Sequence, residues 1–196
     1  MKPNVWLLRP LPNGDNHLSD FLSKNIIAVG YPIDEDFTGK SNSEIETILD
    51  GNDCLDGYTN VVYLVNEMRI GDYVVIPDDN KKDVYFAKIT SDYVYDSDLD
   101  VEDGYPHQRS VRWFFNKKPY PRNDLPEALK GSLRYPGAVA NLAKHFDIVS
   151  RIINGGSIDY QDEVALKQKA LDIAVELLDH DDPKIRLKAA EIIINN

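Results

Sequence analysis

Short apolar segments ended by turn residues dominate the first 150 residues, and they restrict the possible fold more than any other feature. Five or six of them carry the β-branched and aromatic residues that favour strands. These segments are Asn4–Arg9, Ile26–Tyr31, Tyr73–Ile76, Val84–Thr90, Tyr93–Tyr95 and Ser110–Phe115. Helical spacing is expected at His17–Lys24 and at Ser43–Leu49, where Ser43 and Glu46 have the spacing of a capping box. Residues 57–68 suit either a helix or a strand. We therefore expect an α+β fold, built as a small curled mixed β-barrel with flanking helices.

The pattern changes to a helical one from about residue 162. Residues 163–178 carry apolar side chains without a strand period, and Pro183–Ile194 reads as a second helix. Asp182 is a good N-cap, and Pro183 occupies the first helical position, where its missing N–H costs nothing. The sequence thus predicts a barrel domain over residues 1–150 and a C-terminal αα-hairpin over residues 158–196. Two short helices cannot bury all these apolar side chains between them, so we expect the hairpin to contact a second copy, a protein partner or the barrel.

Charge and cysteine content exclude several classes of protein. The chain has 33 acidic and 22 basic residues, a net charge of -11, which argues against non-specific nucleic-acid binding by the whole surface. The single cysteine, Cys54, excludes an intrachain disulfide and a Cys-rich zinc site, and it fits a reducing compartment. No apolar stretch approaches the roughly 18 residues of a membrane span. We expect a cytoplasmic protein without membrane contact.

The common catalytic and metal-binding motifs are missing from the sequence. It contains no phosphate-binding glycine loop, no GxSxG and no HExxH. A nuclease of the PD…(D/E)xK type would need a carboxylate two residues before Lys88, where Phe86 stands. The acidic run from Asp96 to Glu102 resembles the start of a calcium loop, but it lacks the later glycine and glutamate. The expectation is a protein that is not an enzyme and has no catalytic residue, metal or cofactor.

Positive charge is concentrated in one segment, Tyr105–Arg134. It holds seven Lys and Arg against two acidic residues, with aromatic residues interleaved among them. Arginine beside aromatic rings is suited to holding a phosphate while a base is stacked. The alternative is that Trp113 and Phe115 belong to the core and the cations form a solvated face.

Six segments in order resemble the PUA/EVE-like domain at the N-terminus of Mrr-type and other modification-dependent restriction systems. They are WLLRP, FLSKNIIAVGY, RIGDYVVIP, VYFAKITSDYVYD, YPHQRSVRWF and RNDLPEALKGSLR, over roughly residues 4–145. The resemblance implies a small twisted barrel with an aromatic pocket for a flipped or unpaired modified base. It implies base stacking by Trp6, Tyr31, Tyr93 and Trp113, and phosphate or polar contacts from His107, Arg109, Arg112 and Arg122. Tyr31 departs from the pattern, which has Trp, and no nuclease or NTPase segment follows. The run HDDPKIRLKAAEIII is similar to one HEAT-like unit.

The expected function is a non-enzymatic module that binds a modified nucleobase in DNA or RNA, or a free nucleotide, in a restriction or phage-defence context. One alternative is an adaptor subunit that binds a protein partner through the hairpin, and another is a small hydrolase or nuclease with an unrecognised site. A base-binding module predicts an open pocket with aromatic walls, and an adaptor predicts a filled barrel. An enzyme predicts converging carboxylates or a metal.

Overall fold

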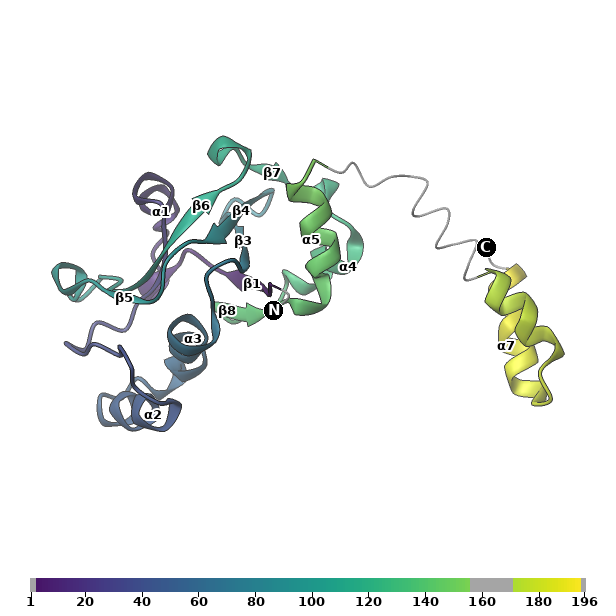
Figure 1. Ribbon diagram of the computed structural model, residues 1–196, viewed down its shortest axis with the longest axis horizontal. Coiled ribbons are helices and arrows are strands. Elements are labelled where there is room, and N and C mark those ends of the chain that lie inside the picture. The colour runs from purple at the N-terminus through teal and green to yellow at the C-terminus, as the bar shows by residue number, and fades with distance from the viewer. Residues whose placement is uncertain (1–2, 156–170, 195–196) are drawn as a thin grey trace. The chain divides into compact units, whose positions relative to one another are not determined.

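The computed structural model describes residues 3–155 and 171–194. The chain divides into two compact units, Met1–Ile153 and Asn154–Asn196. Unit 1 is an α+β domain with a curled mixed sheet in the form of a half-barrel (Figure 1). Its strands are β1 (Val5–Leu8), β2 (Ile26–Val29), β3 (Tyr73–Pro77), β4 (Asp83–Ile89), β5 (Val94–Tyr95), β6 (His107–Trp113), β7 (Tyr120–Pro121) and β8 (Val139–Asn141).

The strand order is β2-β6-β4-β3-β1-β8, with β5 paired to β6 and β7 paired to β4. Strands β1 and β3 are parallel, and the other pairs are antiparallel. The sheet is therefore mixed, as the sequence predicted. Strand β2 lies at one end of this order and the β1–β8 pair lies at the other.

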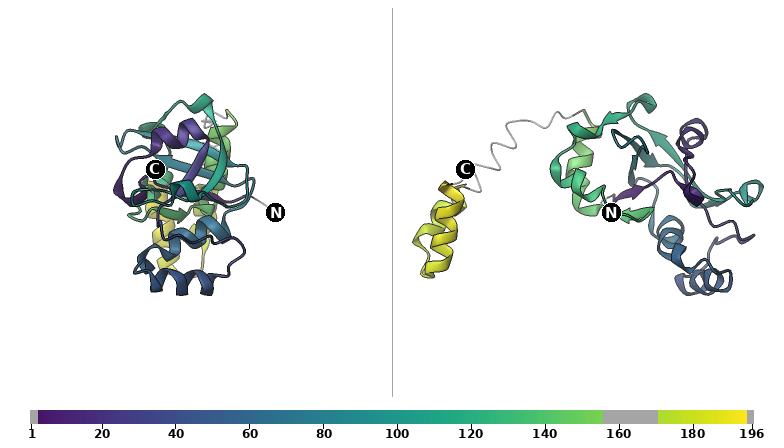
Figure 2. Two further views of the ribbon diagram at one scale, coloured as in Figure 1. Left: turned by 90° about the vertical axis from the view of Figure 1, so that its left-hand side faces the viewer. Right: turned by 180° about the vertical axis from the view of Figure 1, so that it is seen from behind.

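Five helices accompany the sheet in the described part of unit 1 (Figures 1 and 2). They are α1 (Leu18–Lys24), α2 (Asn42–Gly51), α3 (Tyr58–Val62), α4 (Glu127–Ser132) and α5 (Phe146–Ile153). Helix α3 continues into a π turn at Tyr63–Glu67, so the ambiguous residues 57–68 are largely helical. Helices α4 and α5 are absent from the sequence-based expectation.

Both faces of the central strands are buried. Along β1, Trp6 and Leu8 join the larger core, which also contains side chains from α1, α2 and α3. Val5 and Leu7 face the smaller core with side chains from α4 and α5. A strand covered on both faces reads as a continuous apolar run, which is why VWLL shows no alternation of polar and apolar residues.

Helix α2 begins earlier than predicted. The predicted capping box of Ser43 and Glu46 is wrong, because the box is formed by Ser41 and Glu44. The Glu44 carboxylate accepts from the Ser41 N–H at 2.8 Å, and the Ser41 hydroxyl accepts from the Glu44 N–H at 3.4 Å. Two overlapping S-x-x-E patterns occur in SNSEIE, and the earlier one gives the helix an additional two residues.

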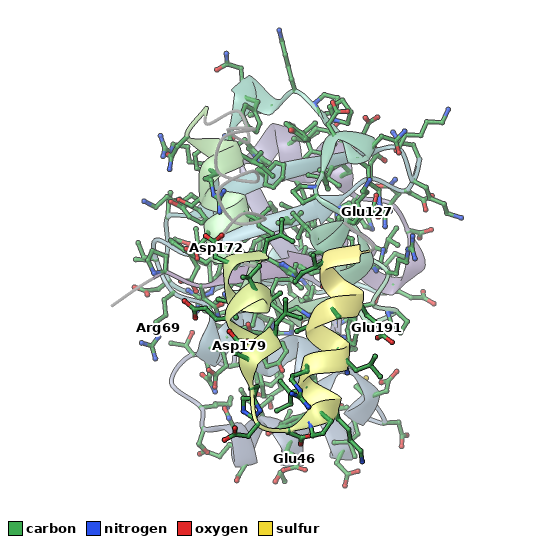
Figure 3. The ribbon with its side chains drawn as sticks, turned by 90° about the vertical axis from the view of Figure 1, so that its right-hand side faces the viewer. Glu46, Arg69, Glu127, Asp172, Asp179 and Glu191 are labelled. Atoms are coloured by element: carbon green, nitrogen blue, oxygen red, sulfur yellow. The ribbon has the colours of Figure 1, made fainter. Side chains whose placement is uncertain are left out.

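The described part of unit 2 is helical. Residues 171–176 are followed by a 3-10 turn at Leu177–Asp179 and by α7 (Pro183–Ile194). Figure 3 shows the first segment, with Asp172, and the turn that ends at Asp179 beside α7, which carries Glu191. As predicted, Asp182 caps α7, because its Oδ1 accepts from the Lys184 N–H at 2.8 Å. Residues 158–170 of the predicted hairpin lie outside the described residues. No helix in the described ranges is long and apolar enough to cross a membrane.

Candidate functional site

A cavity of about 330 Å³ lies between the two edges of the curled sheet. One side is formed by the end of β2 and the following Gly30, and the other by Arg9, which follows β1, and Ala138, which precedes β8. The loop after β1, the turn before α3 and Asn60 of α3 complete the lining. We call this cavity the seam pocket. It exists because the two end strands of the half-barrel do not pair with each other.

Tyr31 forms the aromatic wall of the seam pocket. Its backbone is left-handed, with φ of 68°, which is unusual for a bulky residue. Its ring lies where a Cβ at position 57 would be, so Gly57 is needed for the ring to pack there. The Tyr31 hydroxyl accepts from Asn60 Nδ2 at 3.0 Å, and Asn60 Oδ1 accepts from the Val139 N–H at 3.1 Å. These bonds connect the aromatic wall to α3 and to β8.

The Tyr31 hydroxyl keeps its proton. Burial raises the pKa of the phenol above its ordinary value, and nearby Asp56 raises it further, while the Asn60 hydrogen bond opposes the shift. Within the described ranges the hydroxyl accepts one hydrogen bond and has no acceptor for its own proton. It is therefore a donor available to a ligand in the seam pocket.

A buried hydrogen-bond relay holds Tyr31 from behind. The Tyr31 carbonyl lies 3.1 Å from His107 Nε2, and a carbonyl can only accept, so Nε2 carries the proton. His107 Nδ1 must then accept from the Tyr93 hydroxyl at 2.8 Å, and that hydroxyl accepts from the Phe37 N–H at 3.4 Å. Burial lowers the pKa of His107 to about 4, so the imidazole is neutral at pH 7. The relay fixes the backbone of Tyr31.

Arg9 brings a positive charge to the seam pocket. Its Nε donates to the Gly137 carbonyl at 3.3 Å, and Nη2 donates to the carbonyls of Leu133 and Tyr135 at 3.1 and 2.6 Å. Its Nη1 donates no hydrogen bond within the part of the chain that the structure describes. Burial, followed by the like charge of Arg122, lowers the pKa of Arg9, but a guanidinium stays protonated.

Polar side chains complete the lining. Asp56 is exposed at the turn before α3, and Asn13 is left-handed at φ of 53°. Asn13 Nδ2 donates to the Gly104 carbonyl at 2.9 Å, and its Oδ1 lies so close to Gly30 that a Cβ there would collide with it. The seam pocket thus offers a ring face, amide and carboxylate groups and a guanidinium. No group of three or more metal-binding side chains occurs among the described residues.

The four predicted stacking rings do not share one pocket. Trp6 is 2% exposed, and its Nε1 donates to Asp72 at 2.9 Å in the core. Trp113 is 8% exposed and packs edge-on against Tyr85, and Tyr93 belongs to the relay behind Tyr31. Of the four, only Tyr31 lines the seam pocket. The prediction that Trp6 and Trp113 stack on a base is wrong, because both rings are buried in the larger core.

The predicted phosphate contacts of His107 and Arg109 are also wrong, because both side chains are buried. His107 is fully buried in the relay, and Arg109 is 3% exposed. Arg109 donates to the carbonyls of Leu64, Val65 and Ser91 at 2.6, 2.8 and 3.1 Å, so its donors hold the end of the helical segment after α3. Arg112 is exposed over the Phe114 ring, and Arg122 is half-buried.

Sequence reasoning missed four polar residues of the seam pocket: Arg9, Asn13, Asp56 and Asn60. Asn13 stands in the turn cluster LPNGDN, and Asp56 and Asn60 lie in or beside the stretch whose structure was ambiguous. Only the curl of the sheet brings these segments together. Arg9 carried a local signal, because a charged residue ends the buried run VWLL.

The fold and the seam pocket define the class: a small α+β domain whose incompletely closed mixed sheet holds a polar pocket with one aromatic wall. Residues 6–133 match the family described as Domain of unknown function (DUF8426), and the chain belongs to this family. The matched range includes every lining residue of the seam pocket except Ala138. A comparison with curated proteins finds no match.

Proposed function

We propose that unit 1 is a PUA/EVE-like binding module, without catalytic activity, that takes a modified nucleobase into the seam pocket. Two features support this proposal: the six segments that resemble PUA/EVE-like domains, and the position of Tyr31 at the point where that pattern has Trp. The observation that carries it is the hydrogen bond from Asn60 to the Tyr31 hydroxyl, in a cavity of about 330 Å³ that the Tyr31 ring lines. This volume is within the usual range for small-molecule sites, about 300–1,000 Å³.

Each lining group has a role in this proposal. The Tyr31 ring stacks on the flipped base, and its hydroxyl proton, together with Asn60 and Asp56, reads the edge of the base. The relay through His107 fixes the ring before the ligand arrives, which lowers the entropy lost on binding. Arg9 Nη1, with Arg122 nearby, faces the negative charge of the attached phosphate.

The test is a fluorescence-anisotropy titration with 12-residue oligonucleotides, single-stranded and duplex, each carrying one central base. The panel compares cytosine, 5-methylcytosine, 5-hydroxymethylcytosine, adenine and N6-methyladenine. One modified oligonucleotide should bind more tightly than its unmodified counterpart. Because base–aromatic stacking contributes about 1–3 kcal/mol, Tyr31→Ala should weaken that binding by about 5- to 150-fold.

Tyr135→Ala is the matched control, because it removes a tyrosine ring that is 48% exposed and does not line the seam pocket, and it keeps the backbone carbonyl that accepts from Arg9. It should bind like the wild type. Equal affinity of the wild type for all oligonucleotides, or equal affinity of Tyr31→Ala and the wild type, would overturn the proposal and favour the adaptor or enzyme alternatives.

A further inference from the structure

A second cavity, of about 540 Å³, lies at the other end of the β2–β6 strand pair from the seam pocket. Its lining includes residues just before β2 and the last residues of β6. Three exposed cations border it, and no carboxylate lines it: the cations are Lys24, Arg112 and Lys117. We call it the cation groove.

None of the three cations forms an ion pair in the part of the chain that the structure describes. Lys24 Nζ donates to the Tyr105 hydroxyl at 2.9 Å, and Lys117 Nζ donates to the Leu22 carbonyl at 2.6 Å. The hydrogen bond to Tyr105, with Asp20 and Asp96 at longer range, raises the pKa of Lys24, so this group stays charged. In a chain with a net charge of -11, three neighbouring cations without carboxylate partners form a local site for an anion.

The backbone beside the groove is strained. Phe115, Asn116 and Lys117 are consecutive left-handed residues with φ of 51°, 52° and 63°, and none of them is glycine. A left-handed residue costs roughly 1–2 kcal/mol, so this turn is maintained against its local preference. It places Asn116 and Lys117 in the lining of the groove.

Neutral hydrogen-bond donors surround the cations. Asn25, Thr90, Ser110 and Asn116 also line the groove. Amide and hydroxyl groups beside Lys and Arg are the usual partners of phosphate oxygens in nucleic-acid complexes. Trp113 borders the groove as well, and its indole N–H is buried without a hydrogen-bond partner in the described part of the chain.

We propose that the cation groove binds a backbone phosphate of the nucleic-acid strand whose modified base occupies the seam pocket. The ligand is therefore an oligonucleotide and not a free nucleotide. The groove itself is argued from its own cations and donors. The choice of ligand rests on the function proposed above.

The distance between the two sites determines which ligand can occupy both. Asn25 borders the groove and Gly30 borders the seam pocket, at opposite ends of β2. At about 3.3 Å per residue, the five steps between them span about 16 Å. A strand of B-DNA presents one phosphate per 3.4 Å of axis, so this span corresponds to about five base-pair steps. A mononucleotide carries its phosphate on the sugar of the same base and cannot occupy both sites.

The first experiment tests the groove without any base. Indole N–H signals of ¹⁵N-labelled full-length protein are followed during titration with inorganic phosphate and with an abasic 12-residue strand. The Trp113 signal should shift and saturate, whereas the Trp6 signal should stay, because the Trp6 N–H is bonded to Asp72 in the core. An unchanged Trp6 signal also reports that each variant is folded.

The variant Lys24→Gln/Arg112→Gln/Lys117→Gln should lose the saturable shift. Its matched control, Lys184→Gln/Arg186→Gln/Lys188→Gln, removes the same charge from exposed positions in unit 2 and should keep it. Absence of a saturable shift in the wild type, or the same shift in both variants, would overturn the proposed groove whatever the seam pocket binds.

The second experiment tests whether one strand occupies both sites. Affinity for the preferred modified base is measured for ligands from one to twelve nucleotides, at several salt concentrations. Affinity should rise steeply up to about six nucleotides. Removing the contact to this one phosphate should reduce the slope of log K against log salt by about 0.7 for a single strand and about 0.9 for a duplex. A mononucleotide that binds as tightly as the 12-mer, or an unchanged slope in the groove variant, would overturn the shared ligand. If Tyr31→Ala loses binding and the groove variant does not, the base pocket is supported and the shared ligand is overturned.

Discussion

His107 allows a quantitative test of the relay that holds Tyr31. The perturbation is His107→Gln, which keeps one donor and one acceptor on a side chain that does not titrate. In the wild type, Nε2 donates to the Tyr31 carbonyl and Nδ1 accepts from the Tyr93 hydroxyl, so protonation of His107 at Nδ1 would remove the acceptor of the Tyr93 proton.

The magnitude follows from the pKa of His107. Burial lowers it from 6.5 to about 4, so below pH 6.5 the unfolded chain takes up a proton that the folded chain does not bind. Stability from this group is therefore complete above pH 6.5 and falls as the pH decreases toward 4. At 1.36 kcal/mol per pKa unit, the full loss is about 3 kcal/mol, of which about 2 kcal/mol falls between pH 7 and pH 5.

The assay is urea unfolding followed by tryptophan fluorescence at pH 7 and pH 5. Both tryptophans, Trp6 and Trp113, belong to unit 1, so the signal reports that unit alone. The wild type should lose about 2 kcal/mol more than His107→Gln between the two pH values. His145 and the carboxylates are common to both proteins, so their contributions cancel in the difference.

Two results would refute this reasoning. One is an equal pH dependence of unfolding in the wild type and in His107→Gln. The other is a native-state NMR titration in which the His107 ring protons shift with a midpoint near 6.5, because that would mean that the imidazole is solvated and the relay does not exist.

Two further substitutions test the contacts that position the pocket. Arg109→Met leaves three backbone carbonyls without their donor, and the free energy of unfolding measured in urea should fall by about 3 kcal/mol or more; a loss below about 1 kcal/mol would contradict the buried role of Arg109. Gly57→Ala places a methyl group where the Tyr31 ring packs, so it should cost about 1–3 kcal/mol in the same measurement and abolish the selective oligonucleotide binding proposed above. An unchanged stability and affinity of Gly57→Ala would show that the ring does not occupy that position.

Local patterns were sufficient to predict six of the eight strands of unit 1, but not the short strands β7 and β8. Segments such as Tyr73–Ile76 and Val84–Thr90 combine β-branched residues with clear turn residues, and the structure has β3 and β4 at these places. Helix α5 was missed although its signal was present, since Val149, Ile152 and Ile153 have helical spacing and are buried. One short helical period is outweighed by the strand and turn residues that dominate the first 150 positions.

The alternation of residues along β6 also predicts that Arg109 is buried. Val111 and Trp113 point into the core, and a period of two places His107 and Arg109 on the same face. Charge alone favoured a surface position for both residues, but strand geometry is stronger than that preference when buried partners satisfy the donors. Arg112 has the opposite parity and is exposed.

The seam pocket could not be predicted from local sequence patterns. Arg9, Asn13, Tyr31 and Asn60 lie in four separate segments, and they meet because the sheet curls without pairing its end strands. No period along one segment specifies how far a sheet curls. For the same reason, no local pattern indicates that Lys24 joins Arg112 beside the end of β6.

If unit 1 has the function proposed above, the way β6 divides the basic segment accounts for selective binding of a polyanion by an acidic protein. The Arg109 guanidinium donates its hydrogen bonds to buried carbonyls, whereas Arg112 and Lys117 line the cation groove together with Lys24. A net charge of -11 repels nucleic acid over most of the surface, so few phosphates can contribute to affinity. In the proposed function, discrimination therefore depends on the base in the seam pocket, where Tyr31 is held by buried hydrogen bonds. In this proposal, weak phosphate contacts give fast dissociation from unmodified strands, and the rigid base pocket gives slow dissociation from modified ones.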